Sequence, residues 1–168
     1  MGSTELLMDA FERVRDGVYP AANGLTREEL AFRPDAESNS IAWLIWHLTR
    51  IQDDHVAHLA GAGQRWLEGG WVDRFALPLD PTDTGYGHDS GQVGLVEVDA
   101  AVLLDYYEDV HGTTLAYLGT LDEVALERVV DTSWDPPVTV RIRLVSAIAD
   151  DLQHVGQAAY VRGIAHRR

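Results

Sequence analysis

The sequence predicts an all-α protein, built as a four-helix bundle with a long, partly ordered loop between its second and third helices. Four segments, near residues 4–22, 40–59, 99–118 and 141–163, repeat apolar residues at the three- and four-residue spacing of an amphipathic helix. Strand-like alternation is nearly absent, and glycine and proline separate the segments. The length of 168 residues suits one domain, which we assign to residues 1–168.

The first helix is expected to begin at a cap formed by Ser3 or Thr4, because hydroxyl side chains accept hydrogen bonds from the free N–H groups of a first turn. The dipeptide Asn23-Gly24 favours its end, since both residues tolerate the left-handed backbone found after helices. Thr26 precedes two glutamates, and this order predicts a short helical turn that Thr26 caps.

The second helix is expected to run from Ser40 to Leu59, with Ser40 as its cap and Gly61 at its end. Residues 61–95 are rich in Gly, Pro and Asp, yet structureless loops longer than about 12–15 residues are uncommon in compact domains. We therefore predict a partly ordered flap that covers a site. The alternative is that its aromatic residues fill the core; they are Trp66, Trp71, Phe75 and Tyr86.

The third helix should begin at Asp99, which can act as its cap, and end at Gly119. Residues 122–130 predict an added helical turn, and residues 138–140 are expected to be extended. Apolar spacing resumes near Arg141 and indicates a fourth long helix. Its apolar positions are Leu144, Ile148, Leu152, Val155, Ala159 and Val161.

Charge and composition narrow the function classes. Thirteen basic residues, all of them arginine, stand against 27 acidic ones, giving a net charge of −14 that repels nucleic acids and anionic membranes. The chain contains no cysteine, so it has no disulfide, no thiolate metal ligand and no thiol nucleophile of its own. No signal peptide or membrane span is recognisable, and we expect a cytoplasmic protein.

Three polar residues interrupt apolar helix faces. His47 lies between Leu44 and Ile51 in the apolar stripe of the second helix. Asp150 and His154, four residues apart, project together toward the core from the fourth helix. A buried carboxylate needs a counter-charge, and two imidazoles with one carboxylate suit zinc with an open fourth position, or another divalent ion such as nickel.

Interpretations without a metal are also open. A lone inward histidine is often a hydrogen-bonded core residue, and Asp150 with His154 could form a hydrogen-bonded pair. Asp151 could replace Asp150 as the partner of His154, since it stands three residues before it. Asp54 and His58 lie too far along the second helix to share an ion with His47 but could line the pocket around it. The remaining histidines are interpreted as surface or loop residues: His55, His88, His111 and His166.

Two segments resemble the DinB-like superfamily: Asn39 to Leu48, NSIAWLIWHL, and Asp150 to Gln157, DDLQHVGQ. The resemblance covers nearly the whole chain and points most closely to the mycothiol-linked branch, which includes mycothiol-dependent maleylpyruvate isomerase. Members of the superfamily are four-helix bundles that hold one divalent metal through a histidine of the second helix and two ligands of the last. The resemblance thus implies His47, Asp150 and His154 as metal ligands.

This segment of the last helix differs from the common superfamily pattern, in which two histidines stand four positions apart. Asp150 takes the place of the first histidine, as a glutamate does in the isomerase branch. The isomerase has an additional C-terminal domain, so isomerase activity itself is not expected of these 168 residues.

The resemblance implies a metal-dependent transferase that joins a small thiol, mycothiol in this branch, to a small electrophile. A divalent ion stabilises a bound thiolate, which suits a chain without cysteine. Asp151 and His58 are candidates for the proton acceptor. Two alternatives remain: a metal-dependent hydrolase that uses metal-bound hydroxide, and a non-catalytic bundle that binds a metal or forms a homodimer through an exposed apolar helix face.

Overall fold

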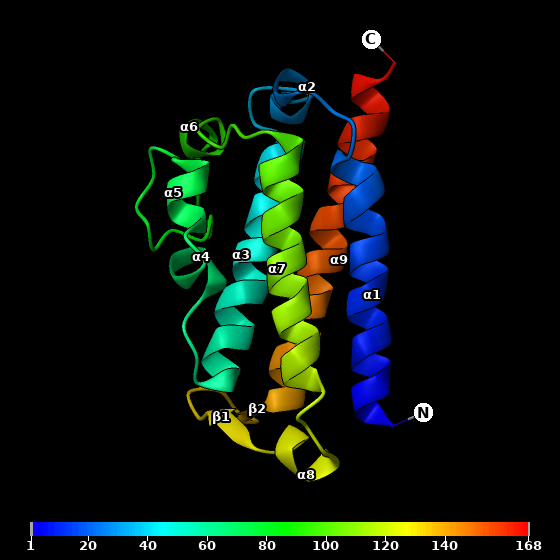
Figure 1. Cartoon of the computed structure of the whole chain (residues 1–168), viewed down its shortest axis with the longest axis vertical. Helices are drawn as coiled ribbons and strands as arrows, with labels where there is room; N and C mark the ends of the chain where they lie inside the picture. Colours follow the sequence, from blue (N-terminus) through cyan, green and yellow to red (C-terminus); the bar gives the residue numbers. More distant parts are fainter. Residues whose placement is uncertain (1, 168) are drawn as a thin grey trace.

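The structure, a computed structural model that describes residues 2–167, confirms the predicted helical bundle (Figure 1). Its long helices are α1 (Ser3–Ala22), α3 (Ile41–Ala60), α7 (Ala100–Leu118) and α9 (Val140–Ala165). Six of the shorter elements lie in the connections: α2 (Arg27–Ala31), α4 (Arg65–Glu68), α5 (Trp71–Phe75), α6 (Ser90–Val93), α8 (Glu123–Leu126) and β1 (Val129–Asp131). β1 pairs antiparallel with β2 (Val138–Thr139), the segment predicted to be extended.

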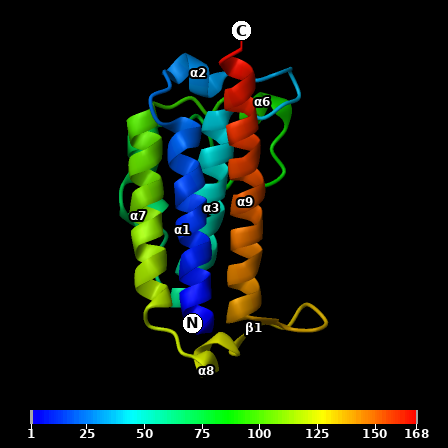
Figure 2. The ribbon, with the colours of Figure 1, turned by 90° about the vertical axis from the view of Figure 1, so that its right-hand side faces the viewer.

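The long helices form two parallel pairs that run in opposite directions. α1 and α9 run in one direction along the long axis, and α3 and α7 run in the other (Figures 1 and 2). α3 packs chiefly against α9 and α7, and α1 packs against the same two helices from the opposite side. The α3–α9 interface, which is the most extensive, therefore brings residues from the middle and from the end of the chain together.

Helix ends follow local capping chemistry. The Ser40 hydroxyl accepts a hydrogen bond from the backbone N–H of Trp43 at 3.1 Å, and Gly61 ends α3 with φ +65°. The predicted cap of α1, Ser3 or Thr4, was wrong, because the N-cap residue of this helix is Gly2. Ser3 lies inside the first turn, where its hydroxyl donates a hydrogen bond to Glu123 at 2.9 Å.

The segment between α3 and α7 folds into short helices that lie against α3 and α7 (Figure 1). The tryptophans of this segment fill the core, as the alternative interpretation predicted, whereas Tyr86 is 88% exposed. Asp53 of α3 anchors the segment. Its carboxylate accepts hydrogen bonds from the backbone N–H groups of Arg65 and Trp66 at 2.8 and 2.7 Å.

Arg50, one turn before Asp53, is completely buried beneath the same segment. Its guanidinium donates hydrogen bonds to the carbonyl of Asp83 at 3.1 Å and to the side chain of Gln64 at 2.8 Å. It also lies 5.1 Å from the ring of Trp66, which adds a cation–π contact. A buried cation and a buried anion on adjacent turns of α3 thus hold the segment in place.

Several expectations about burial are corrected. His88 and His111 were expected on the surface or in loops. His88 does lie in the loop before α6 and His111 lies in α7, but their side chains are only 2% and 4% exposed. Packing against aromatic rings explains both: His88 contacts Trp43, and His111 stacks on Tyr107. Leu152 and Ala159, expected on the buried face of the last helix, are exposed, because α9 carries apolar residues on both of its faces. No helix within residues 2–167 has the length and apolar character needed to cross a bilayer.

Candidate metal centre

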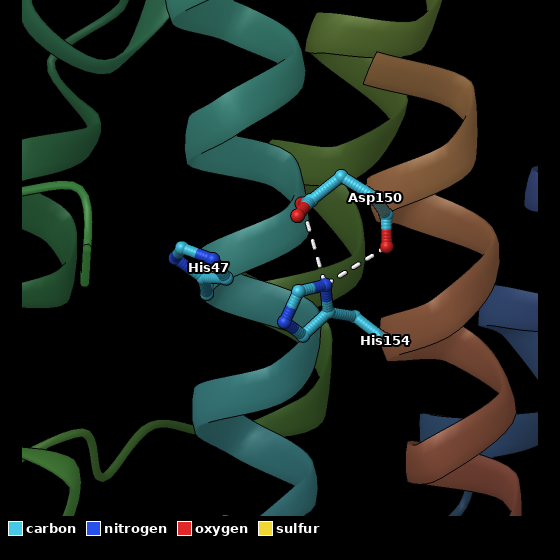
Figure 3. A group of neighbouring side chains, drawn as sticks. All are labelled: His47, Asp150 and His154. Carbon is cyan, nitrogen blue, oxygen red and sulfur yellow. Dashed lines mark hydrogen bonds and ion pairs between the residues drawn. The ribbon is translucent and has the colours of Figure 1, made fainter. Parts of the chain in front are cut away.

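The three residues predicted as metal ligands come together between α3 and α9 (Figure 3). His47 projects from α3, and Asp150 and His154 project from consecutive turns of α9. One ligand atom from each residue lies within 4.8 Å of the corresponding atoms of the other two. The antiparallel packing of α3 and α9 therefore makes one cluster from residues more than a hundred positions apart.

The imidazole of His47 is held on two sides. Its Nδ1 lies 2.6 Å from the carbonyl oxygen of Thr84, and a carbonyl can only accept a hydrogen bond, so Nδ1 carries the proton. Nε2 is consequently unprotonated and able to coordinate a metal. The ring of Trp43 stacks on the imidazole, with centroids 4.6 Å apart and planes 12° from parallel. Such outer contacts fix the tautomer and the ring orientation of a metal-binding histidine.

The imidazole of His154 is oriented in the same way from within α9. Its Nδ1 donates a hydrogen bond to the backbone carbonyl of Asp150 at 2.8 Å and lies 3.3 Å from the Asp150 carboxylate (Figure 3). The rings of His47 and His154 lie 4.7 Å apart at 71°. Both histidines thus use Nδ1 for a backbone carbonyl and keep Nε2 for a ligand.

The direction of the pKa shift and its cause differ among the three side chains. Burial lowers the pKa of His47, and this effect outweighs the hydrogen bond to Thr84, which acts in the opposite direction. Burial also disfavours the protonated form of His154, but its hydrogen bonds to Asp150 prevail and raise its pKa. The pKa of Asp150 is lowered, because His154 and His47 together overcome the opposing effect of burial. At neutral pH His47 is therefore neutral and Asp150 is ionised.

The donor set fits a divalent cation. The Oδ2 atom of Asp150 is buried and negatively charged, and within residues 2–167 no donor meets it with the alignment of a hydrogen bond, although Nδ1 of His154 lies 3.3 Å away. A cation between Asp150 and the two Nε2 atoms would satisfy that oxygen. Two imidazoles and one carboxylate form the three-ligand set of catalytic zinc sites, in which a fourth position stays open.

A loop within the predicted flap supports His47, a contact that sequence reasoning did not predict. Gly85 has φ +89°, and a Cβ atom at this position would lie 2.7 Å from Nδ1 of His47. Nδ1 of His88 accepts a hydrogen bond from Nε1 of Trp43 at 3.1 Å. The other ring nitrogen of His88 lies 3.0 Å from the Asp83 carboxylate, without the alignment of a hydrogen bond. The only sequence signal was the pair of glycines in TGYGH, which indicates a turn and nothing about its neighbours.

The other predicted residues lie outside this cluster. Asp151 is completely buried near Tyr107 of α7, and it is not one of the residues whose ligand atoms come together. Burial raises its pKa well above the usual range for an aspartate, and the charge of Asp150 adds to the effect. Asp54 and His58 line a cavity of about 370 Å³ farther along α3, together with His55 and Arg143, and none of the three proposed ligands lines it. We name it the His55–Arg143 cavity.

Comparisons with known proteins agree with the fold. The family model described as Mycothiol-S-transferase matches residues 6–166. The chain is also similar to the crystal structure of a conserved protein from Enterococcus faecalis, with a TM-score of 0.93 and 31% sequence identity over 100% of this chain and 99% of that one. A search of curated proteins gives no match. Because the family model covers almost its entire length, the chain belongs to the mycothiol S-transferase family, a DinB-like family.

Proposed function

We propose that the protein is a metal-dependent transferase that joins the sulfur of a small thiol to an electrophilic small molecule. The observation that carries the proposal is the meeting of His47, Asp150 and His154, with both imidazoles oriented to offer Nε2. The family match favours mycothiol as the thiol. The ligand types favour zinc, with nickel or another divalent ion as the alternative.

The cluster supplies what such a reaction needs. A divalent ion held there would lower the pKa of a bound thiol and so provide a nucleophile at neutral pH. The sulfur must come from the co-substrate, because the chain contains no cysteine. Its S–H bond breaks and a bond forms between sulfur and the electrophilic atom. The proton passes to a base, and the leaving group departs with its electron pair.

His55 is the residue that we propose as the proton acceptor. It lines the His55–Arg143 cavity, and it lies close enough to Asp150 for their charges to affect each other's pKa. Burial and the charge of Arg143 lower the pKa of His55, which is therefore neutral and able to accept a proton at neutral pH. Asp151, which is completely buried, and His58, eleven residues from His47, are less well placed.

The test combines metal analysis with thiol consumption. Untagged wild-type protein is expected to hold about one divalent ion per chain and to conjugate mycothiol with an electrophile such as 1-chloro-2,4-dinitrobenzene. His47→Ala and His154→Ala should lose both the ion and the activity, and His55→Gln should keep the ion while turnover falls. Metal retained in His47→Ala would remove the proposed centre.

The same assay separates the alternatives. Turnover of an ester that does not require the thiol would indicate the hydrolase. A metal-loaded protein without either activity would indicate a non-catalytic bundle. An exposed apolar row on α9 favours the homodimer variant of that hypothesis and contains Ile142, Val145 and Leu152. Sedimentation of wild type and Val145→Glu measures it, since a charge in a shared interface should dissociate the dimer.

A further inference from the structure

A second cavity lies farther along α3 and α9, in the direction opposite to the His55–Arg143 cavity. It has a volume of about 470 Å³ and lies between α3, α9 and the loop that precedes α3. Leu44 and Val161 contribute apolar surface, whereas Asn39 and Gln157 contribute side-chain amides. We name it the Asn39–Gln157 cavity.

The positions of its residues on the two helices place this cavity beside the cluster. Leu44 precedes His47 by three residues on α3, and Gln157 follows His154 by three residues on α9. Three residues of helix rise about 4.5 Å. Because α3 and α9 are antiparallel (Figures 1 and 2), the two displacements have the same direction. The end of the cavity nearest the cluster, at Leu44 and Gln157, is therefore about one helical turn from the ligand residues along the helices.

The polar groups of the cavity are not used by the fold. Within residues 2–167, no intramolecular hydrogen bond engages the amides of Asn39 and Gln157, the carboxylate of Glu37 or the hydroxyl of Tyr160. The ring of Tyr160 is 70% exposed. Amides donate and accept, and carboxylates accept, so the set suits a ligand that presents several hydroxyl groups. The exposed tyrosine ring adds a flat apolar surface for a ligand.

Charge excludes one class of ligand. Asp35 and Glu37 are the charged residues that line the cavity, and the chain as a whole carries a net charge of −14. A carboxylate or phosphate would be repelled there. An uncharged or cationic group that is rich in hydroxyls would not be repelled by these carboxylates.

The wall of the cavity formed by residues 34–39 is held in place before any ligand binds. The guanidinium of Arg33 donates hydrogen bonds to the carbonyls of Ser38 and Ala36 within the loop. It also donates to the carbonyl and the hydroxyl of Ser90 in α6, each at 2.9 Å. Such preorganisation reduces the conformational entropy lost on binding.

We propose that the Asn39–Gln157 cavity binds the hydroxyl-rich part of the thiol co-substrate, while the sulfur reaches the ligand cluster one turn away. The inference rests on the proposed function and adds the residues that select the thiol. Mycothiol belongs to this chemical class, because its cysteine is joined through an amide to an uncharged glucosamine–inositol unit. The electrophile would then bind in the His55–Arg143 cavity, on the other side of the cluster.

The experiment uses three probes: mycothiol, the glucosaminyl-inositol fragment without cysteine, and N-acetylcysteine without the sugar. The double variant Asn39→Ala/Gln157→Ala should bind mycothiol and the fragment at least tenfold more weakly than wild type, since two hydrogen-bonding groups are removed. The KM for N-acetylcysteine and the metal content should stay within twofold. Gln153→Ala, an exposed glutamine of α9 that does not line the cavity, is the matched control and should bind all three probes like wild type.

Fragment binding is measured by calorimetry on metal-free and metal-loaded protein, so it requires no turnover. Fragment binding that weakens in the double variant supports the cavity even if no thiol transfer is found, and in that case only the proposed function fails. Equal fragment affinity in wild type and double variant, or no fragment binding by wild type at millimolar concentration, overturns the cavity assignment. An increase in KM for the electrophile alone also overturns it, because that would place the other substrate in the cavity.

Discussion

Gly85 and His47 are in such close contact that no side chain fits between them. A Cβ atom at position 85 would lie 2.7 Å from Nδ1 of His47, and the same loop supplies the Thr84 carbonyl that this nitrogen contacts at 2.6 Å. The loop therefore fixes both the position and the tautomer of the one proposed ligand that α3 contributes. Outer contacts of this kind affect metal affinity about 10–100-fold.

Gly85→Ala is accordingly expected to weaken metal binding at least tenfold while the helical fold persists. Gly87→Ala is the matched control, because Gly87 also has a positive φ, +76°, but a Cβ there would meet nothing within 4 Å. Both variants carry the strain of a side chain at positive φ, and only the first displaces His47. Competition with a chromogenic chelator measures the two affinities. Equal affinities in the two variants would show that backbone strain, and not contact with His47, determines the result.

The ligand cluster could be predicted from sequence because it depends on local periodicity. His47 falls in an apolar stripe, and Asp150 and His154 are four residues apart, so helical geometry alone turns these side chains toward the core. The choice of Asp150 over Asp151 also follows from helical direction, and the burial of Asp151 away from the cluster agrees with it. Periodicity could not show whether the face of α3 that carries His47 would pack against the face of α9 that carries Asp150 and His154.

The support of the cluster could not be predicted, because it depends on tertiary contacts of a loop. Nothing in the sequence around Thr84 and Gly85 indicates that the backbone there returns to His47. His88 does lie in a loop, as predicted, but its burial against Trp43 was missed for the same reason. The exposure of Leu152 was missed for a different reason: α9 is apolar on two faces, and composition cannot tell which one the bundle covers.

Metal binding should weaken at acidic pH, and the pKa of His154 should determine the pH at which this weakening begins. The pKa of His154 is raised by its hydrogen bonds to Asp150, while burial lowers the pKa of His47, so His154 takes up a proton first as the pH falls. Because a ligand histidine must be neutral, one displaced proton lowers the apparent affinity about tenfold per pH unit below that pKa. Chelator competition across the acidic range checks this slope.

An NMR titration of the two imidazoles in metal-free protein assigns the effect. His154 should titrate at higher pH than His47, and Asp150→Asn should move the His154 titration to lower pH, because it removes the carboxylate that favours the imidazolium. The reverse order in wild type would contradict the assignment of proton competition to His154.

We expect Asp151 to lower the free energy of unfolding at neutral pH. It is completely buried, neither of its oxygens has a hydrogen-bond partner within residues 2–167, and burial raises its pKa well above the usual value. The folded protein therefore keeps a proton that the unfolded chain releases above its ordinary aspartate pKa. Stability is lost as the pH rises, by up to about 1.4 kcal/mol per pH unit for this one proton.

Asp151→Asn removes that dependence, since an amide does not ionise. We expect urea denaturation of the metal-free variant to give a higher free energy of unfolding than wild type near neutral pH. The difference should shrink toward zero below about pH 3, where the unfolded aspartate is also largely protonated. A variant that is less stable than wild type at every pH would mean that the carboxyl group is a net stabilising hydrogen-bond partner in solution.

Asp53 and Asp54 are neighbours in sequence with opposite structural roles, and their comparison tests what holds the aromatic segment on the bundle. Asp53 is 3% exposed and accepts hydrogen bonds from the N–H groups of Arg65 and Trp66 and from the hydroxyl of Tyr106. Its replacement by alanine would leave these donors buried and unpaired. It would also remove the carboxylate nearest to the buried guanidinium of Arg50, at 3.9 Å.

Asp53→Ala should therefore lower the free energy of unfolding by about 3–5 kcal/mol, the range for breaking a buried charge pair. Asp54→Ala should cost no more than about 1 kcal/mol, because that side chain is 44% exposed and accepts one hydrogen bond, from Gln64. Chemical denaturation of the metal-free proteins compares them. Since the segment also carries Thr84 and Gly85, Asp53→Ala should weaken metal binding as well, and Asp54→Ala should not. A destabilised Asp53→Ala protein with full metal affinity would show that the loop at residues 83–88 keeps its place on α3 without this anchor.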